Sequence, residues 1–156
     1  MAKGKPPTAR PRGAPREKPG LRYIESSALA AALLERDAAA LKSVRARSLR
    51  IASGVTIAET GRAILRAEAG GRVTTEQARS LVRALRRFER RTYLMPVTDA
   101  VLRRVQRRFP LEPVRTLDAV HLATAESLGE SPHLITIVTR DGRVGDNARA
   151  LGFAVE

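Results

Sequence analysis

The sequence predicts a single α/β domain in which helices cover both faces of a central parallel sheet. Two observations indicate this fold. Strand signals and helix signals alternate along the chain after residue 20, which is the order expected of parallel strands joined by helical crossovers. The chain has 156 residues, enough for one domain that buries roughly two-thirds of the surface of its unfolded form. We therefore expect one domain over 21–156.

The segment before this domain is basic and has no apolar periodicity. Residues 1–20 are rich in Pro, Gly, Arg and Lys, and such a composition cannot bury enough apolar surface to offset the entropy lost on ordering. We predict a disordered basic N-terminal arm. It would either add salt-dependent affinity for phosphates or only aid solubility, and the sequence favours neither role.

The first half of the domain is predicted to be mainly helical. Its elements are, in order, a strand over 21–25, helices over 27–36 and 38–47, a short strand over 49–52 and helices over 55–69 and 75–90. Gly70 and Gly71 end the fifth of these elements. Thr74 and Gln77 form a capping box, in which each side chain bonds the other residue's backbone N–H, and this starts the sixth.

Strands and helices alternate more evenly in the second half of the domain. Its predicted elements are a strand over 93–97, a helix over 98–108, a loop over 109–113, a helix over 117–128, a strand over 135–139, a helix over 144–151 and a strand over 153–155. The run 135–139 is the most strand-like, with Ile and Val between two threonines. The helix over 117–128 carries little polarity on any face for much of its length, so we expect it in the centre of the domain.

Composition limits the chemistry that the chain can perform. The sequence contains no cysteine, which excludes disulfides, thiolate metal ligands and a cysteine nucleophile. Only two histidines, His121 and His133, are present, so carboxylates remain as the main ligands, and these suit hard cations such as Mg²⁺ or Mn²⁺. The net charge of +13 implies a polyanionic partner.

No segment has the length and composition of a membrane span. The apolar run over 28–34 is too short to cross a bilayer or to form the core of a secretion signal, and acids flank it at Glu25 and Glu35. We expect a cytoplasmic protein that does not associate with membranes.

Four acids stand where a predicted strand ends or a helix begins: Glu25, Glu59, Asp118 and Asp141. Because open parallel sheets place their sites outside the carboxyl ends of the strands, we expect these side chains to converge. Carboxylates held close together repel one another unless a cation lies between them. A divalent ion there would activate a water and stabilise a leaving oxygen, so this cluster in a basic chain indicates a metal-dependent phosphodiesterase.

Each acid also has a purely structural explanation. Glu59 and Asp118 would be stabilised by the helix dipole in a first turn, Asp141 would form a turn beside Gly142, and Glu25 would be a surface acid. The occurrence of all four in this order favours the functional interpretation.

The stretches around these acids resemble the PIN domain, in particular the VapC-type toxins of bacterial toxin–antitoxin pairs. The resemblance rests on 23–29, Glu59 in its helix, 115–125, 138–143 and 148–153. Its most specific part is the Leu-Asp-Ala-x-His-Leu-Ala core at 117–123. The resemblance implies a PIN-like three-layer α/β/α fold and a Mg²⁺- or Mn²⁺-dependent endoribonuclease that acts on RNA. It also implies a homodimer, inhibited by a cognate antitoxin whose tail occupies the active-site groove.

The resemblance also implies which residues hold the metal. The family's acids fall on Glu25, Glu59, Asp118 and Asp141, with Asp118 and Glu25 as the most direct ligands. Asp141 and Glu59 would complete the site directly, through water, or by orienting the attacking water. Two hydroxyl residues, Ser27 and Thr139, would hydrogen-bond the carboxylates.

One site position departs from the family pattern, because PIN domains have Asp where this chain has Glu25. Three functions therefore stay open: an active nuclease, a catalytically weakened RNA-binding module, and a regulatory subunit that acts through an antitoxin or operator complex. Arg140 and Arg143 would contact RNA phosphates or remain an ordinary solvated pair. His121, three residues after Asp118, is interpreted as a packed, hydrogen-bonded histidine rather than a general base.

Overall fold

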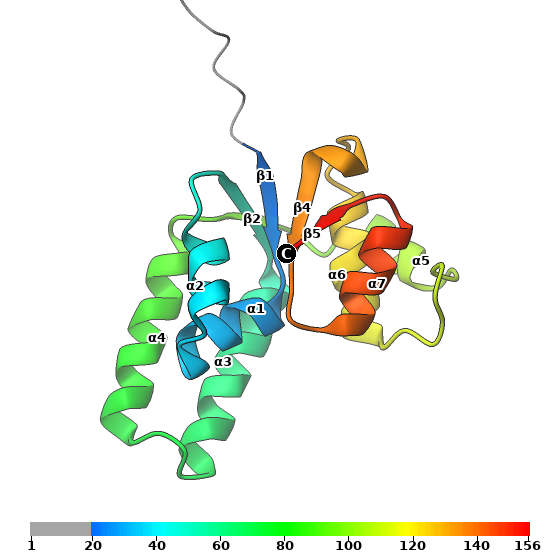
Figure 1. The fold of residues 1–156 in the computed structure, drawn as a ribbon. Helices are drawn as coiled ribbons and strands as arrows, with labels where there is room; N and C mark the ends of the chain where they lie inside the picture. The colour runs from blue at the N-terminus through cyan, green and yellow to red at the C-terminus, as the bar shows by residue number, and fades with distance from the viewer. Residues whose placement is uncertain (1–19) are drawn as a thin grey trace, which may run out of the picture.

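The computed structural model describes residues 20–156. The predicted basic arm falls almost entirely on residues 1–19, outside the described part. Five strands form one sheet: β1 (Leu21–Ile24), β2 (Leu49–Ser53), β3 (Tyr93–Met95), β4 (Ile135–Val138) and β5 (Ala154–Val155). Their order in the sheet is β3-β2-β1-β4-β5, and every pair is parallel (Figure 1). The carboxyl ends of all five strands therefore point toward the same edge of the sheet.

Helices cover both faces of this sheet, as predicted. They are α1 (Ser26–Ala30), the π-helix η1 (Ala31–Glu35), α2 (Ala38–Arg45), α3 (Gly54–Ala69), α4 (Thr75–Glu89), α5 (Asp99–Val105), α6 (Thr116–Glu126), the 3₁₀-helix η2 (Pro132–Leu134) and α7 (Gly142–Ala150). In Figure 1, α1 to α4 lie on one side of the sheet and α5 to α7 on the other. The expected three-layer α/β/α architecture is confirmed.

Two hydrophobic cores separate along the central strand β1. Tyr23 packs with residues of α5, α6 and α7, among them Leu122, whereas Ile24 packs with residues of α1, α3 and α4, among them Ile64. The side chains of Tyr23 and Ile24 are both fully buried. Successive residues of a strand face opposite sides of a sheet, so one dipeptide of β1 anchors both helical layers. The end of β1 is thereby fixed between them.

Local sequence signals set most element boundaries. The capping box at Thr74 and Gln77 is confirmed, with bonds of 2.8 and 3.2 Å between side chain and backbone. A second box, between Ser53 and Thr56, starts α3 directly after β2. The strand predicted over 93–97 ends at Met95, because Pro96 has no N–H to donate to a neighbouring strand.

One predicted helix is divided in the structure. The helix expected over 27–36 is the short α1 followed by η1, and it ends at Arg36, whose φ of 54° is left-handed. The N–H of Asp37 then donates to the carbonyl of Ala31 at 3.1 Å, and the Asp37 side chain caps α2 by accepting from Ala40 N at 2.6 Å. The chain therefore turns sharply between the two helices.

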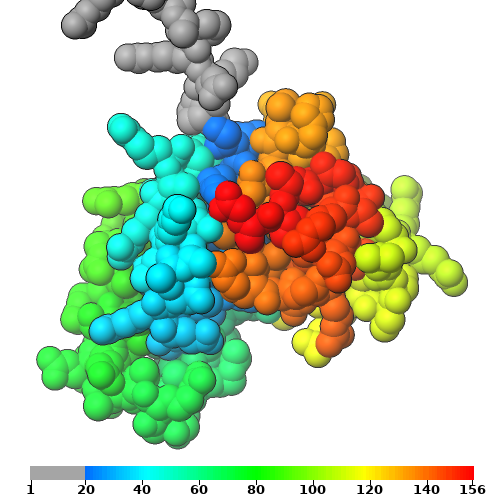
Figure 2. Space-filling view, in the orientation of Figure 1, coloured from blue at the N-terminus to red at the C-terminus, as the bar shows by residue number. Residues whose placement is uncertain are grey.

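The C-terminal residues lie on the surface between α2 and α7, as Figure 2 shows. The N–H of Thr139 donates to the carbonyl of Glu156 at 2.9 Å, continuing the pairing of β4 with β5. The carboxylate of Glu156 accepts from Arg22 of β1 at 3.2 Å. The backbone just after β4, where Thr139 lies, is thereby held in register with β1.

No helix in the part of the chain described here is long and apolar enough to span a membrane.

Candidate functional site

Glu25 ends β1 and caps the next helix with its own side chain. Its backbone is extended, with φ −85° and ψ 157°, and its carboxylate accepts from Ser27 N at 3.0 Å at the start of α1. Hydroxyl donors are Ser26 at 2.6 Å, Thr139 at 2.8 Å and Ser27. Only 4% of the residue is exposed, so the interpretation of Glu25 as a surface acid is wrong. Each of these donors gives the carboxylate a hydrogen bond, so both of its oxygens have partners in spite of burial.

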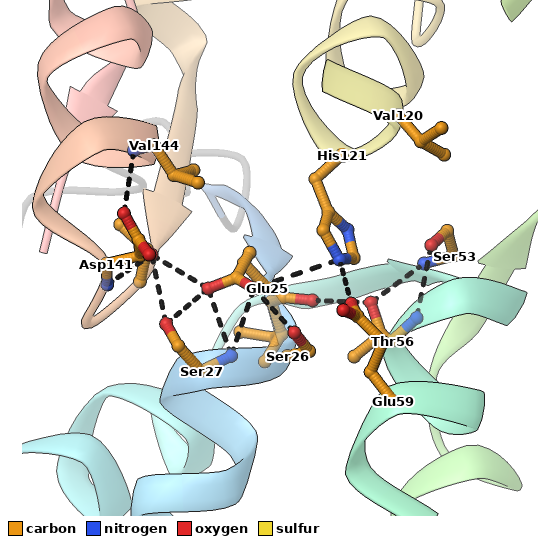
Figure 3. A network of polar contacts seen from close by, with 12 residues as sticks. Glu25, Ser26, Ser27, Ser53, Thr56, Glu59, Val120, His121, Asp141 and Val144 are labelled. Atoms are coloured by element: carbon orange, nitrogen blue, oxygen red, sulfur yellow. Dashed lines mark hydrogen bonds and ion pairs between the residues drawn. The ribbon is translucent and has the colours of Figure 1, made fainter. Parts of the chain in front are cut away.

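The two hydroxyl residues beside Glu25 also fix the segment after β4. Ser27 Oγ accepts from Arg140 N at 2.8 Å, and Thr139 Oγ1 accepts from Asp141 N at 3.0 Å. Figure 3 shows Ser27 and Asp141 on either side of the Glu25 carboxylate. Each hydroxyl donates to Glu25 and accepts from the backbone next to Asp141. The positions of Glu25 and Asp141 are therefore coupled through two side chains.

Glu59 reaches the same edge of the sheet from α3, where it meets His121 of α6. Its Oε2 lies 2.8 Å from Nε2 of His121, and Glu25 Oε1 lies 3.8 Å from the same nitrogen. Partial burial by itself would raise the pKa of Glu59, but the hydrogen bond with His121 and further favourable contacts outweigh it and lower the pKa. Glu59 is thus held ionised and oriented toward Glu25 (Figure 3).

A compact group of possible metal ligands results. Glu25, Glu59 and His121 each offer one ligand atom, and these atoms all lie within 4.8 Å of one another. His121 is only 1% exposed. It is packed and hydrogen-bonded, as the sequence suggested, but its contacts are with the proposed site, which the sequence interpretation did not include. Its spacing offered a signal, because residues three apart share a helix face and His121 follows Asp118 by three.

Asp118 lies in the first turn of α6 beside this group. Its Oδ2 is buried and has no hydrogen-bond partner among the described residues. Burial raises the pKa of Asp118, and the charges of Asp141 and Glu25 raise it further. The structure thus brings Asp118 close to two other acids, although it is not among the three residues whose ligand atoms lie within 4.8 Å of one another.

Asp141 is held by the start of α7. Its Oδ1 accepts from the backbone N–H groups of Arg143 and Val144 at 2.8 and 3.3 Å, so it caps that helix. This local role matches the turn-forming interpretation. The charge of Asp141 also raises the pKa of Asp118. Both roles fit one side chain, because the second carboxylate oxygen is not used in capping.

The two arginines near Asp141 differ in their contacts. Arg140 donates to the carbonyl of Thr139 at 3.2 Å and lies 3.5 Å from Asp37. Arg143 is exposed in the first turn of α7 and has no ion pair among the described residues. Arg143 is therefore the more available of the two for a solvent-borne anion.

These residues fit a divalent cation. The cluster offers carboxylate oxygens, which are the ligands of Mg²⁺ and Mn²⁺, and a buried Asp118 oxygen with no partner. The pKa of Asp118 is raised by burial and by two neighbouring acids, and a cation between these carboxyl groups would stabilise its charged form. The arrangement has the donors and the electrostatic need of a metal centre.

Comparisons with known proteins find a family and relatives that match most of the chain. The profile of the PIN domain matches residues 22–150. Two ribonucleases of Mycobacterium tuberculosis are similar along most of their length. Ribonuclease VapC35 is 36% identical over 137 residues, which is 85% of this chain and 93% of the relative. Ribonuclease VapC46 is 36% identical over 135 residues, which is 85% of this chain and 94% of the relative.

A solved structure supports the fold alone. The crystal structure of PAE2754 from Pyrobaculum aerophilum superposes with a TM-score of 0.60 at 22% identity and covers 87% of this chain and 83% of its own.

Proposed function

Because the chain belongs to the PIN domain family, we propose that it is a metal-dependent endoribonuclease, the toxin of a type II toxin–antitoxin pair. The observation that carries this proposal is the group of buried and half-buried acids at the carboxyl edge of the sheet, with one Asp118 oxygen left unpartnered. The names of the two mycobacterial relatives, both ribonucleases, support the same activity. The family resemblance expected from the sequence is confirmed.

Glu25, Glu59, Asp118 and Asp141 would hold the ion, Mg²⁺ or Mn²⁺. When bound, such an ion supplies Lewis acidity, lowering the pKa of a bound water and polarising the phosphate. The protein's part is to hold the carboxylates in place. Ser27 and Thr139 do this for Glu25, and the start of α7 does it for Asp141. Arg143, with Arg140 beside it, would position the RNA backbone through phosphate contacts.

The replacement of the family's Asp by Glu25 bears directly on activity. The longer side chain folds back over the start of α1, where backbone and hydroxyl groups donate to both oxygens. These donors hold the buried carboxylate in one orientation at the end of β1.

The same contacts favour a second candidate function. An oxygen that already accepts two or three hydrogen bonds has few lone-pair directions left for a cation. A PIN-fold RNA-binding or regulatory protein with weakened hydrolysis would fit that observation.

The remaining parts of the proposal follow from the family. The partners would be an RNA substrate and a cognate antitoxin, the protein would be a cytoplasmic homodimer, and residues 21–156 would form the nuclease domain behind a basic arm at 1–20. The net charge of +13 supports a polyanionic substrate.

The test is cleavage of total RNA by the purified full-length protein, freed of any antitoxin, with Mg²⁺ or Mn²⁺. Discrete metal-dependent products that vanish in Asp118→Asn are expected. Asp99→Asn is the matched control, because Asp99 is an exposed acid in the first turn of α5. If wild type is silent and Glu25→Asp cuts, the second candidate is correct. Silence from both with every metal removes the nuclease assignment.

A further inference from the structure

Exposed arginines accompany three of the four acids of the proposed metal centre. Each arginine lies within seven residues of its acid, in or directly before the same helix. The pairs are Glu59 with Arg66 on α3, Asp118 with Arg115 at the start of α6, and Asp141 with Arg143 at the start of α7. Arg143 already contributes to the proposed function, whereas Arg66 and Arg115 have no part in it.

Arg66 lies on the same face of α3 as Glu59. Seven positions along the chain separate the two residues, which is about two turns of an α-helix, or about 10 Å along its axis. In Figure 1, α3 begins at the end of β2 and runs away from the sheet, so Arg66 lies farther from the sheet than Glu59. The charge of Arg66 is one of the effects that lower the pKa of Glu59. Its guanidinium group is therefore near the acid cluster.

Arg115 flanks the cluster from the opposite helical layer. It is the residue before α6, with an extended backbone at φ −72° and ψ 151°, and it is exposed. The pKa of Asp118 is raised overall, but the charge of Arg115 is among the effects that lower it. Arg115 therefore lies close enough to Asp118 for the two charges to interact.

Neither arginine is held by an acid. Among residues 20–156, Arg66 and Arg115 form no ion pair, whereas Arg104 pairs with Glu126 at 2.8 Å. Both guanidinium groups therefore keep donors for an anion from solvent. A guanidinium group can hold a phosphate with two parallel hydrogen bonds.

The acid cluster needs such cations if a polyanion is to reach it. Four ionised carboxylates and one divalent ion together still carry negative charge, so the metal centre alone would repel RNA. In Figure 1, α3 lies on one side of the sheet and α6 on the other. Arg66 and Arg115 therefore place positive charge on both sides of the acids.

We propose that Arg66 and Arg115 contact RNA phosphates on opposite sides of the metal centre, so that one RNA strand crosses the acid cluster from α3 to α6. This inference rests on the proposed nuclease function and adds the path of the substrate. Contacts with phosphates position the strand without reading its bases. Arg143, at the start of α7, would bind a phosphate of the same strand.

The first test is binding of a fluorescein-labelled single-stranded RNA to the full-length protein over a range of salt concentrations. The measurement is made with Mg²⁺ in the Asp118→Asn background, which prevents cleavage. Each phosphate contact contributes about 0.7 to the slope of log K against log salt for single strands. Arg66→Ala and Arg115→Ala should each reduce this slope by about 0.7, and the double variant by about 1.4. An unchanged slope in either single variant overturns the proposed path.

Two exposed arginines on other surfaces serve as controls. Arg62 also belongs to α3, but it lines the groove between α3 and α4 with Leu65 and Val82. Arg103 lies in the last turn of α5. Arg62→Ala and Arg103→Ala should leave the slope unchanged. If they reduce it as much as Arg66→Ala does, RNA is attracted by net charge alone and the proposal is wrong.

The second test separates phosphate contact from an effect on the acids. In cleavage assays with Mn²⁺, Arg66→Ala and Arg115→Ala should raise KM several-fold and leave kcat nearly unchanged, because a contact made equally in the ground state and the transition state affects binding alone. A lower kcat with unchanged RNA binding would mean that the arginines only tune Glu59 and Asp118, and the proposal would be wrong. If wild type cleaves with no metal but the salt slopes are as expected, the nuclease function fails while the two RNA contacts stand.

Discussion

The hydroxyl of Thr139 donates a hydrogen bond of 2.8 Å to the carboxylate of Glu25, although the two residues are 114 positions apart. They follow the adjacent parallel strands β4 and β1, which pair from Leu21 with Ile135 to Ile24 with Val138. The register of these strands therefore sets the geometry of the proposed metal centre. A side chain that terminates one strand supplies a partner for the buried acid that terminates its neighbour.

Replacing Thr139 by Val should lower both stability and RNA cleavage. The substitution keeps the shape of the side chain but removes a donor to Glu25 and an acceptor for Asp141 N. Leaving buried polar groups without a partner costs about 1–3 kcal/mol. Chemical denaturation measures the loss, and cleavage assays should show a lower kcat.

Thr136→Val is the matched control for that experiment. Thr136 lies on the same strand, is half-buried and has no side-chain hydrogen bond among the described residues. Its replacement should change the free energy of unfolding by less than about 0.5 kcal/mol. Equal losses in the two variants would mean that the Thr139 hydroxyl has no special role.

The Asp118→Asn variant should be more stable than wild type when metal is chelated. Its Tm should also rise less than that of wild type when metal is added. The pKa of Asp118 is raised by burial and by its acidic neighbours, so its charged form opposes folding near pH 7. With EDTA we expect a small gain in Tm, because solvent screens part of the repulsion at this half-exposed carboxyl group. Added Mn²⁺ should raise the Tm of wild type and leave that of the variant almost unchanged. A destabilised variant with EDTA would contradict this account.

The fold was largely predictable from the sequence because its signals are local. The Thr74–Gln77 capping box, the β-branched run of β4 and the mostly apolar α6 each act within a few residues. Alternation of strand and helix then implied the parallel sheet. The division of the first helix at Ala31 was not predictable, since it depends on how Arg36 and Asp37 turn the chain.

The positions of the acids could be anticipated from strand ends, but their contacts could not. Burial of Glu25 depends on Thr139, and orientation of Glu59 depends on His121, 62 positions later. Such partners are set by tertiary packing, which one sequence does not encode in any local pattern. For the same reason the contact between His121 and Glu59 became visible only in the structure.

Stability should depend on Glu59 above about pH 4.5 and lose that dependence in acid. The pKa of Glu59 is lowered below its ordinary value of 4.5. A group with a depressed folded pKa stabilises fully above its unfolded pKa, and this stabilisation is lost as the pH falls through the folded pKa. With EDTA, Glu59→Gln should be less stable than wild type by roughly 1 kcal/mol at pH 7. The difference should vanish toward pH 3, whereas the exposed Glu130→Gln should show no such trend.

Removing Arg143 should weaken RNA binding without abolishing cleavage. Arg143 is exposed beside Asp141, and each phosphate contact that is lost reduces the dependence of log K on log salt by about 0.7 for single strands. We expect this smaller slope in Arg143→Ala, measured with the non-cleaving Asp118→Asn background. Arg149→Ala is the control, because Arg149 lies at the other end of α7 and pairs with Asp146 at 3.0 Å. An unchanged slope in Arg143→Ala would remove it from the RNA interface.

Asn147→Ala should lower the free energy of unfolding more than most substitutions outside the acid cluster. Asn147 is 1% exposed and holds both backbone groups of Leu111, accepting from its N–H and donating to its carbonyl, each at 2.9 Å. Leu111 belongs to the segment that leads into α6, and α6 carries Asp118. Truncation leaves two backbone groups without their partner, at a cost of about 2–3 kcal/mol.

The control for this variant is Asp146→Ala, at the exposed residue next to Asn147. Among residues 20–156 its one ion pair is a surface contact with Arg149, so a loss of less than about 1 kcal/mol is expected. If the segment around Leu111 helps to place Asp118, Asn147→Ala should also bind Mn²⁺ more weakly under conditions where it remains folded, and Asp146→Ala should not. Weaker stability with unchanged metal affinity would show that α6 keeps Asp118 in place without help from Asn147.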